Sequence, residues 1–456
     1  MLKPPTESPG NGTGPWNFTL PKDATFTDEY APLLPEDERT AQLVHQRLIQ
    51  EVDVKAVEKL GADRSVEAVE MATRALLAEV GPALYGERKE RVIRRIVDDA
   101  VGLGPLQPLV NDLSISEVMV NSPDEIYFER DGIIYLSALR FRDRDHVSLV
   151  IDRIIAPVGR RVDESSPFVD ARLPDGSRVN IIIPPLVPRS PTITIRKFRP
   201  DKYDMQDLVQ IGTLTQTVAD FLRAAVQLRL NIVISGGTGT GKTTLLSALS
   251  AYIPERERII TIEDPIELKL HQRHVIACEA RPPNIEGRNE VAQRDLLRNA
   301  LRMRPDRIIV GEVRGAEAFD MMQAMNTGHE GSLTTVHSNS PRDALSRIEN
   351  MMLMAGFDLP VRAIREQMAA AFHLVVQLAR FADGSRRVVT VSEVVGMEET
   401  TVTMQELFKF EVASIEPDGR IDGALAATGL MPTFAERFTR AGIALESFLP
   451  NIARWA

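Results

Sequence analysis

A glycine-rich loop has the residue types and the spacing that bind nucleotide phosphates. It consists of Gly236, Gly237, Thr238, Gly239, Thr240, Gly241, Lys242, Thr243 and Thr244, which contain the pattern G-x-x-x-x-G-K-[ST]. Glycines let successive backbone N–H groups turn inward around a phosphate, and a following helix adds the positive end of its dipole. Lys242 can reach the β and γ phosphates, and the Thr243 hydroxyl can ligate Mg²⁺. An ordinary glycine-rich turn is the alternative.

The residues on either side predict the strand and the helix that such a loop requires. The apolar β-branched run at 232–234 suits a buried strand, and Leu245, Leu246 and Leu249 share one face of a helix that follows at once. This context favours phosphate binding over a turn.

A cluster of carboxylates follows a second apolar run, at 258–262. The cluster consists of Glu263, Asp264 and Glu267. Because parallel strands bind ligands at their carboxyl ends, these groups can hold Mg²⁺ through water or polarise an attacking water. An acidic surface turn is the alternative, and the residues alone leave open which glutamate would be the base.

A third apolar run, at 307–310, ends in Gly311 and Glu312. Many phosphate-loop enzymes carry a metal-binding Asp at the position of Gly311, so we expect Glu312 to supply the acidic group. Asp306 lies at the wrong end of this strand.

Two histidines flank the glycine-rich turn and strand at 327–337. We expect His329 to contact the γ-phosphate or sense its loss, and His337 to do so less directly. A structural role is the alternative for each.

Arginines form two further groups. Arg172, Arg178 and Arg196 each lie in or beside a predicted strand, where they can clamp a γ-phosphate within the chain or across a subunit interface; a surface role is the alternative. The second group is a basic series whose early members recur every four residues and form a helix face, for which a solvated surface, a phosphate or subunit contact and a nucleic-acid contact all stay open. Its members are Arg294, Arg298, Arg302, Arg304 and Arg307.

The composition limits the class of protein. A chain of 456 residues is long enough for two or more domains, and the net charge of −10 argues weakly against a whole-surface nucleic-acid binder. A single cysteine, Cys278, allows no internal disulfide and no multi-cysteine zinc module, which suits a reducing compartment. No secretory signal is seen, and no apolar run approaches the ~20 residues of a membrane span. We therefore expect membrane association to be peripheral.

Composition and periodicity divide the chain into six segments. They are a disordered tail at 1–34, a helical module at 35–100, an α+β domain at 101–200, a linker at 201–212, a nucleotide-binding core at 213–395 and a C-terminal extension at 396–456.

Four motifs in this order resemble those of the type II/IV secretion ATPase superfamily. Residues 236–244, 261–267, 310–314 and 327–337 correspond to its Walker A, Asp box, Walker B and His box, and Gly311 matches the family. The resemblance covers about residues 100–400. Three further stretches are similar to the CpaF/TadA-type motor of tight-adherence (Tad) pili, namely 161–167, 173–180 and 193–198.

The resemblance implies an α/β fold class, with a RecA-like P-loop core, an α+β (PAS-like) N-terminal domain and the small helical module. It implies a homohexamer that binds ATP and Mg²⁺ and whose ATP turnover drives inner-membrane platform proteins to extend or retract a pilus. The protein would be cytoplasmic, peripheral at the inner membrane through these partners, with no nucleic acid expected.

The resemblance also implies roles for residues. Glu267 or Glu263 would activate water with support from Glu312, and Thr243, Glu263, Asp264 and Glu312 are the metal candidates. Two other functions stay open. One is a nucleic-acid-stimulated ATPase of a conjugation or type IV secretion system, which the acidic net charge disfavours. The other is a nucleotide-gated scaffold, which Lys242 together with separate acidic and His elements disfavours.

Overall fold

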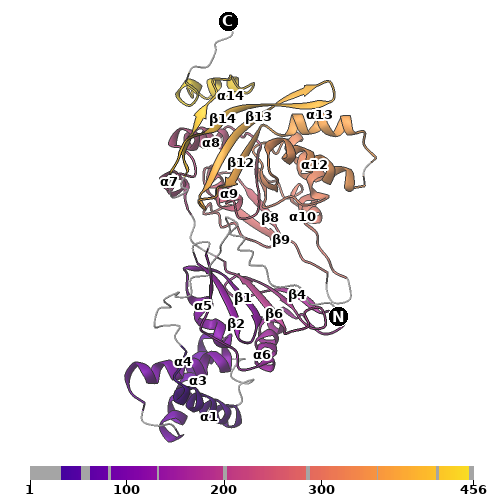
Figure 1. Cartoon of the computed structure of the whole chain (residues 1–456). Coiled ribbons are helices and arrows are strands. Elements are labelled where there is room, and N and C mark those ends of the chain that lie inside the picture. The colour runs from indigo at the N-terminus through magenta and orange to yellow at the C-terminus, as the bar shows by residue number, and fades with distance from the viewer. Residues whose placement is uncertain are drawn as a thin grey trace, which may run out of the picture. The chain divides into compact units, whose positions relative to one another are not determined.

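The computed structural model describes residues 32–52, 62–80, 84–130, 133–198, 203–283, 288–356, 358–416 and 421–450. The chain divides into two compact units, Met1–Arg199 and Pro200–Ala456 (Figure 1). The predicted disordered tail at 1–34 lies outside the described residues except for its last three.

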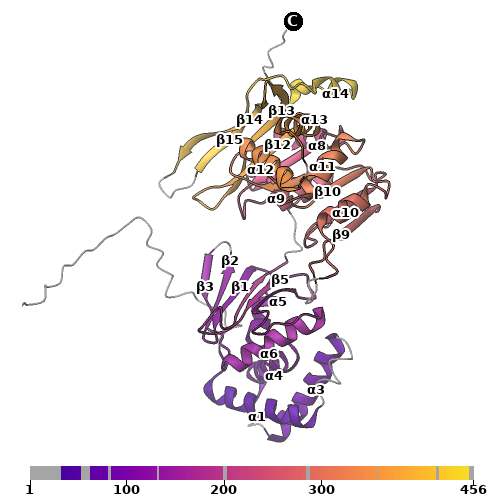
Figure 2. The ribbon, with the colours of Figure 1, turned by 90° about the vertical axis from the view of Figure 1, so that its right-hand side faces the viewer.

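In its described residues, the first unit begins with helices that pack together. They are α1 (Pro35–Glu51), α3 (Ala62–Val80) and α4 (Gly86–Val101) (Figure 2). Their apolar residues recur at helical spacing, and Val44, Leu48, Val92 and Ile96 are all at most 1% exposed. These buried faces form a small core of their own.

The rest of the first unit is an antiparallel sheet with a helix on it. Its elements are η2 (Gly104–Leu106), α5 (Gln107–Asn111), β1 (Ile115–Ser122), β2 (Glu125–Arg130), β3 (Ile133–Leu136), α6 (Arg144–Ile155), η3 (Ala156–Val158), β4 (Phe168–Arg172), β5 (Arg178–Ile182) and β6 (Thr192–Arg196). The strand order is β3-β2-β1-β6-β5-β4. Val147, Ile151 and Ile154 of α6 join the buried residues of the strands in one core.

The second unit contains a nine-stranded sheet. Its strands are β7 (Ile232–Gly236), β8 (Ile259–Glu263), β9 (Val275–Glu279), β10 (Arg307–Val310), β11 (Leu333–His337), β12 (Leu374–Arg380), β13 (Arg386–Glu398), β14 (Thr401–Ile415) and β15 (Ile421–Ala427). The order is β15-β14-β13-β12-β7-β11-β10-β8-β9. The strands from β12 to β9 are parallel, and β13, β14 and β15 continue the sheet as antiparallel strands.

Helices cover both faces of this sheet. They are α7 (Met205–Gln210), α8 (Gln216–Gln227), α9 (Lys242–Ser250), α10 (Gln293–Ala300), α11 (Glu317–Asn326), α12 (Pro341–Met354), α13 (Val361–Ala371) and α14 (Ala435–Arg440), followed by η4 (Leu445–Ser447). Ile232 and Ile234 of β7 face the core built with α7, α8, α9 and α14, whereas Val233 faces the core with α10 to α13. The predicted α/β fold class with a RecA-like core is confirmed.

Two predicted boundaries differ from the structure. The segment expected as a linker at 201–212 contains α7, because Met205 and Leu208 pack into the core of the second unit. The sheet also continues past residue 395 through β14 and β15, since Phe408 and Leu425 belong to that same core. Within the residues that the structure describes, no helix is long and apolar enough to cross a membrane.

Candidate active site

The glycine-rich loop joins β7 to α9, as the sequence predicts. A Cβ on Gly236 would lie 2.5 Å from Thr240 Oγ1 and 2.9 Å from the carbonyl oxygen of Leu378, so this position has no room for a side chain. Gly239 and Gly241 have φ angles of 70° and 95°, in the left-handed region that glycine tolerates. The tight loop therefore depends on its glycines.

Lys242 is held inside this loop and faces a histidine. Its Nζ donates to the carbonyl oxygen of Gly237 at 2.8 Å and lies 3.4 Å from each ring nitrogen of His337. The register of the sheet brings the two together, because His337 at the end of β11 pairs with Gly236 at the end of β7.

An acid and a second cation complete a chain of charges. His337 Nε2 lies 3.1 Å from Glu312 Oε1, and Arg314 donates to Glu312 Oε2 at 2.9 Å. The structure thus joins Lys242, His337, Glu312 and Arg314 in one row at the carboxyl edge of the parallel strands. His337 was expected to have the lesser role of the two histidines, and Arg314, although within the predicted Walker B segment, was not among the expected site residues.

Burial and neighbouring charges set the protonation of this row. Burial lowers the pKa of Lys242, and burial together with Lys242 lowers the pKa of His337, which favours a neutral imidazole. Burial acts to raise the pKa of Glu312, but the Arg314 hydrogen bond and the nearby cations outweigh it and lower that pKa. Glu312 is therefore an ionised carboxylate beside the phosphate loop.

Glu263 is buried behind this row. Its Oε1 accepts hydrogen bonds from the backbone N–H groups of Glu267 and Leu268, at 3.1 and 3.0 Å. Burial raises its pKa to about 7. A buried carboxyl that holds the backbone of the following loop is poorly suited to bind Mg²⁺, so this geometry does not support the metal role expected for Glu263.

Glu267 and Asp264 lie on the loop that Glu263 holds. Glu267 is half-buried, and its charge acts on both Lys242 and Arg314. Asp264 is exposed, and its charge acts on Arg314. Of the three carboxylates in this cluster, Glu267 is the half-buried one whose charge reaches the phosphate-loop lysine.

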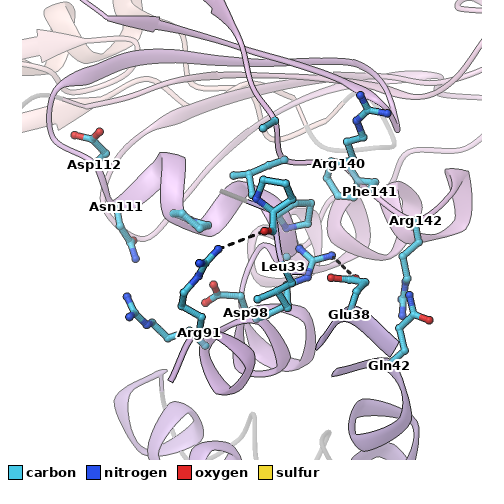
Figure 3. A pocket seen from close by; sticks show the side chains of 18 of the residues that line it. Leu33, Glu38, Gln42, Arg91, Asp98, Asn111, Asp112, Arg140, Phe141 and Arg142 are labelled. Atoms are coloured by element: carbon cyan, nitrogen blue, oxygen red, sulfur yellow. Dashed lines mark hydrogen bonds and ion pairs between the residues drawn. The ribbon is translucent and has the colours of Figure 1, made fainter. Parts of the chain in front are cut away.

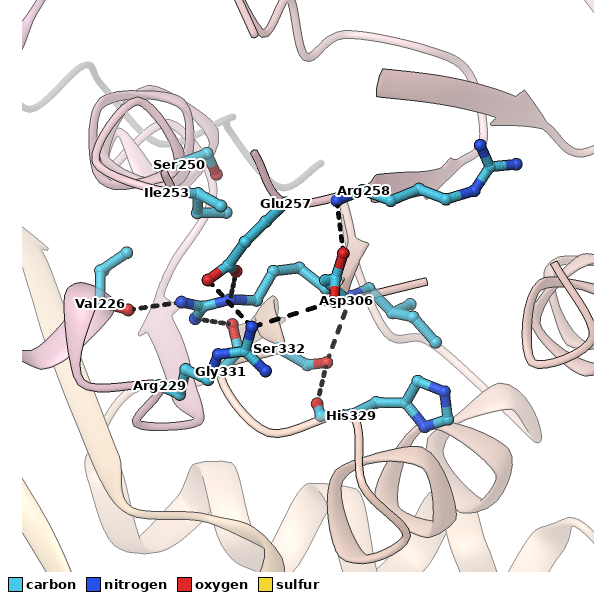
Figure 4. A network of polar contacts seen from close by, with 12 residues as sticks. Val226, Arg229, Ser250, Ile253, Glu257, Arg258, Asp306, His329, Gly331 and Ser332 are labelled. Carbon is cyan, nitrogen blue, oxygen red and sulfur yellow. Dashed lines mark hydrogen bonds and ion pairs between the residues drawn. The ribbon is translucent and has the colours of Figure 1, made fainter. Parts of the chain in front are cut away.

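The structure does not bring His329 to this edge. His329 precedes β11, whose first residue, Leu333, pairs with Ile232 at the start of β7. His329, shown in Figure 4 on the turn that carries Gly331 and Ser332, therefore lies at the amino end of the strands, whereas His337, which pairs with Gly236, lies at the carboxyl end. A five-residue strand spans about 16 Å, so His329 is out of reach of the loop in its own chain.

A buried arginine lies beside the segment that carries His329. Arg307, the last arginine of the basic series, is the first residue of β10, in the strand that the run at 307–310 predicts, and is 0% exposed. Its Nε pairs with Glu257 at 2.5 Å, and its terminal nitrogens donate to the carbonyl oxygens of Gly331 and Val226, both at 2.9 Å (Figure 4). The run at 307–310 predicts this strand, but nothing in it indicates that the guanidinium group is buried against Glu257 and two carbonyl oxygens.

Two other arginines of the predicted basic face form ion pairs within the chain. Arg294 and Arg298 of α10 both pair with Asp320 of α11, at 2.7 and 3.0 Å. These two ion pairs connect α10 to α11, which gives both arginines a structural role.

The three candidate clamp arginines lie in the first unit, in one row across its sheet. Arg172 pairs in register with Arg178, and Arg178 with Arg196. Directly opposed residues share a face, so the three side chains share one face of the sheet. Arg196 also forms an ion pair of 2.9 Å with Glu117.

The residues at the loop fit a magnesium nucleotide by the chemistry of their donors. Among the described residues no group of three His, Cys, Asp or Glu side chains could hold a metal by itself. Mg²⁺ in nucleotide sites typically needs only one or two protein oxygens besides the phosphates. The Thr243 hydroxyl and the Glu312 carboxylate are such donors.

Fold and site together define a P-loop nucleotide-binding protein with a RecA-like core. Residues 99–415 match the family model for type II/IV secretion system proteins, and the chain belongs to this family. The predicted superfamily is therefore confirmed.

The chain is similar to several named proteins. The chain is 36% identical over 306 residues to a putative conjugal transfer protein of Mycobacterium tuberculosis, covering 66% of this chain and 86% of that protein. It is 32% identical over 315 residues to the conjugal transfer protein TrbB of Rhizobium radiobacter, covering 68% and 91%. The crystal structure of the VirB11 ATPase of the Brucella suis type IV secretion system is 32% identical, covering 63% of this chain and 94% of that one, with a TM-score of 0.35.

Proposed function

We propose that this chain is an ATP-hydrolysing motor subunit that powers assembly, and in some states retraction, of a Tad or type IV-like pilus or secretion system. The observation that carries the proposal is the row from Lys242 through His337 to Glu312 at the phosphate loop. A site for binding alone would not need an ionised acid and a neutral histidine beside the lysine.

Each residue has a role in this proposal. The loop N–H groups and Lys242 bind the phosphates of ATP, while Thr243 and Glu312 hold Mg²⁺, which neutralises charge on those phosphates. His337 links Lys242 to Glu312 and fixes both side chains. Glu267 accepts the proton of the attacking water, because its charge reaches the lysine while Glu263 is engaged with the backbone.

The assembly is part of the same proposal. A homohexamer would bring Arg172, Arg178 and Arg196 to a nucleotide as a clamp, and their shared face on one sheet supports their acting together. The family membership supports a position at the inner membrane, reached through platform proteins of a pilus or secretion machine.

Steady-state ATP hydrolysis against protein concentration tests this proposal. We expect turnover per subunit to rise with concentration, and Glu267→Gln to reduce it at least about 100-fold. Asp264→Asn is the matched control, since it removes a neighbouring exposed carboxylate, and it should retain most activity. Full activity in Glu267→Gln would refute the assignment of the base. Absence of hydrolysis by the wild type at every concentration, with nucleotide still bound, would favour the scaffold.

A nucleic-acid-stimulated ATPase is the second candidate, because two of the relatives carry conjugal transfer names. The pairing of Arg294 and Arg298 with Asp320 counts against it. Stimulation of hydrolysis by single- or double-stranded DNA, lost in a double Arg→Gln variant of these two residues, would establish it.

A further inference from the structure

A cavity of about 1340 Å³ opens in the first unit, whereas the phosphate loop belongs to the second (Figure 3). Its wall combines α1 and α4 of the helical module with the segment after α4 and the residues that lead into α6. Typical ligand pockets have volumes of roughly 300–1,000 Å³, so this cavity has room for a molecule of nucleotide size and its water.

The charge of the cavity contrasts with that of the chain. Six arginines line it, namely Arg91, Arg94, Arg95, Arg130, Arg140 and Arg142, against three carboxylates, Glu38, Asp98 and Asp112. The chain as a whole has a net charge of −10. A local excess of guanidinium groups in an acidic protein attracts anions.

Protein contacts hold three of these arginines. Arg95 lies 3.7 Å from Glu38, and Arg130 pairs with Asp112 at 2.5 Å. Arg91 donates to the carbonyl oxygen of Pro32 at 3.4 Å. These contacts fix one part of the wall in place.

The other three arginines form no ion pair with any residue that the structure describes. Arg94 comes from α4, whereas Arg140 and Arg142 come from the segment between β3 and α6. In addition, Nε of Arg130 is shielded from solvent and has no acceptor among the described residues. Arg94, Arg140 and Arg142 are exposed to solvent, so guanidinium donors on both sides of one cavity are available to a bound anion.

The wall also has an apolar part. Leu113, Leu139, Pro105 and Pro108 line the cavity along with the arginines. A free inorganic anion would leave this surface bare, whereas a molecule with an apolar or aromatic body would cover it.

We propose that this cavity binds a phosphorylated small molecule of nucleotide size, distinct from the ATP at the phosphate loop. Its phosphates contact Arg94, Arg140 and Arg142, and its body packs on the Leu113 side. Guanidinium groups favour phosphate because their planar fork donates two parallel hydrogen bonds to two of its oxygens. Such a ligand joins the helical module to the α+β domain.

The test measures binding in the full-length chain with the phosphate loop disabled by Lys242→Ala and Thr243→Ala. The probes are ADP and inorganic pyrophosphate, titrated by calorimetry in that background. Arg94→Gln, Arg140→Gln and Arg142→Gln are combined in one variant. The matched control combines Arg39→Gln, Arg144→Gln and Arg189→Gln, which are exposed in the same unit, do not line the cavity and make the same change in charge.

We expect saturable binding of ADP, weakened at least about tenfold by the cavity variant and less than about threefold by the control, provided that both variants unfold at the same urea concentration as the background. Absence of saturable binding of either probe would overturn the proposal, as would equal weakening in the two variants. Binding of a hexaglutamate peptide in place of both probes would also overturn it, in favour of an acidic protein segment. None of these results depends on ATP hydrolysis.

Discussion

The side chain of Glu263 occupies the space that a side chain at position 311 would need. A Cβ on Gly311 would lie 2.8 Å from Cγ of Glu263 and 3.1 Å from its Oε1. The two residues lie at the carboxyl ends of the neighbouring strands β8 and β10. Many phosphate-loop enzymes have a metal-binding Asp at this position. Here close packing against Glu263 requires a glycine, and the buried acid is Glu263 of the neighbouring strand β8.

Gly311→Ala should therefore displace Glu263. We expect the free energy of unfolding to fall by about 1–3 kcal/mol, the usual cost of overpacking a core, and ATP hydrolysis to fall with it because the loop that carries Glu267 loses its anchor. Urea unfolding measures the first effect. In a Glu263→Ala background the same substitution should cost less than about 0.5 kcal/mol; an equal cost in both backgrounds would contradict the contact.

The raised pKa of Glu263 predicts a pH dependence of stability. Burial raises its pKa from 4.5, the ordinary value of a glutamate in an unfolded chain, to about 7 in the folded protein. Between these values the folded chain binds more protons than the unfolded chain, so the contribution of Glu263 is full below pH 4.5 and is lost as the pH rises through 7. The shift corresponds to about 3 kcal/mol.

Glu263→Gln should remove that dependence, since the amide stays neutral. Urea unfolding of both proteins at pH 5 and pH 8 should show the wild type losing more stability than the variant on going to pH 8. Identical pH slopes would show that the buried carboxyl titrates normally.

The two histidines of the 327–337 segment should differ in their effect on catalysis. His337→Ala removes the group between Lys242 and Glu312, so we expect turnover to fall at least about tenfold with little change in the unfolding midpoint. His329→Ala should leave turnover per folded subunit within about twofold. A larger effect of His329→Ala on turnover would mean that His329 contacts a nucleotide. Because His329 is out of reach of the phosphate loop in its own chain, that nucleotide would have to be bound by another subunit.

The two glycines of the same segment offer a matched pair. A Cβ on Gly331 would lie 1.8 Å from a terminal nitrogen of Arg307, whereas a Cβ on Gly328 would meet nothing within 4 Å. Both have positive φ angles, 84° and 96°. Gly328→Ala should cost about 1–2 kcal/mol of left-handed strain, and Gly331→Ala more than about 3 kcal/mol, because it also breaks a buried ion pair. Equal losses in thermal unfolding would argue against the Arg307 contact.

Much of the site could be predicted because local patterns determine it. The run 232–234 and the motif that ends at Thr243 fix a strand, a loop and a helix within about 20 residues. The register that places His337 beside Lys242 arises from pairing between β7 and β11, whose paired residues lie 101 positions apart in the sequence. Spacing along the chain does not determine this register, so it does not show which histidine lies at the phosphate loop.

Two other features depend on tertiary partners that the local sequence does not show. The burial of Arg307 depends on Glu257, a distant residue that neutralises its charge. The short helix α7 lies within the predicted linker, because only Met205 and Leu208 mark its buried face. In each case a tertiary partner outweighs the local pattern.

The two ends of strand β11 lie in different surroundings, one at the phosphate loop and the other at a buried ion pair. Its carboxyl end holds a side chain at the phosphate loop, and its amino end abuts the buried pair of Arg307 and Glu257. Lesions within one short motif should therefore give two phenotypes. Those near Gly331 should be temperature-sensitive and suppressed by chaperones or low growth temperature, whereas those at His337 should reduce function equally at every temperature, with normal protein levels. A genetic screen could sort the motif into its two halves without a purified protein.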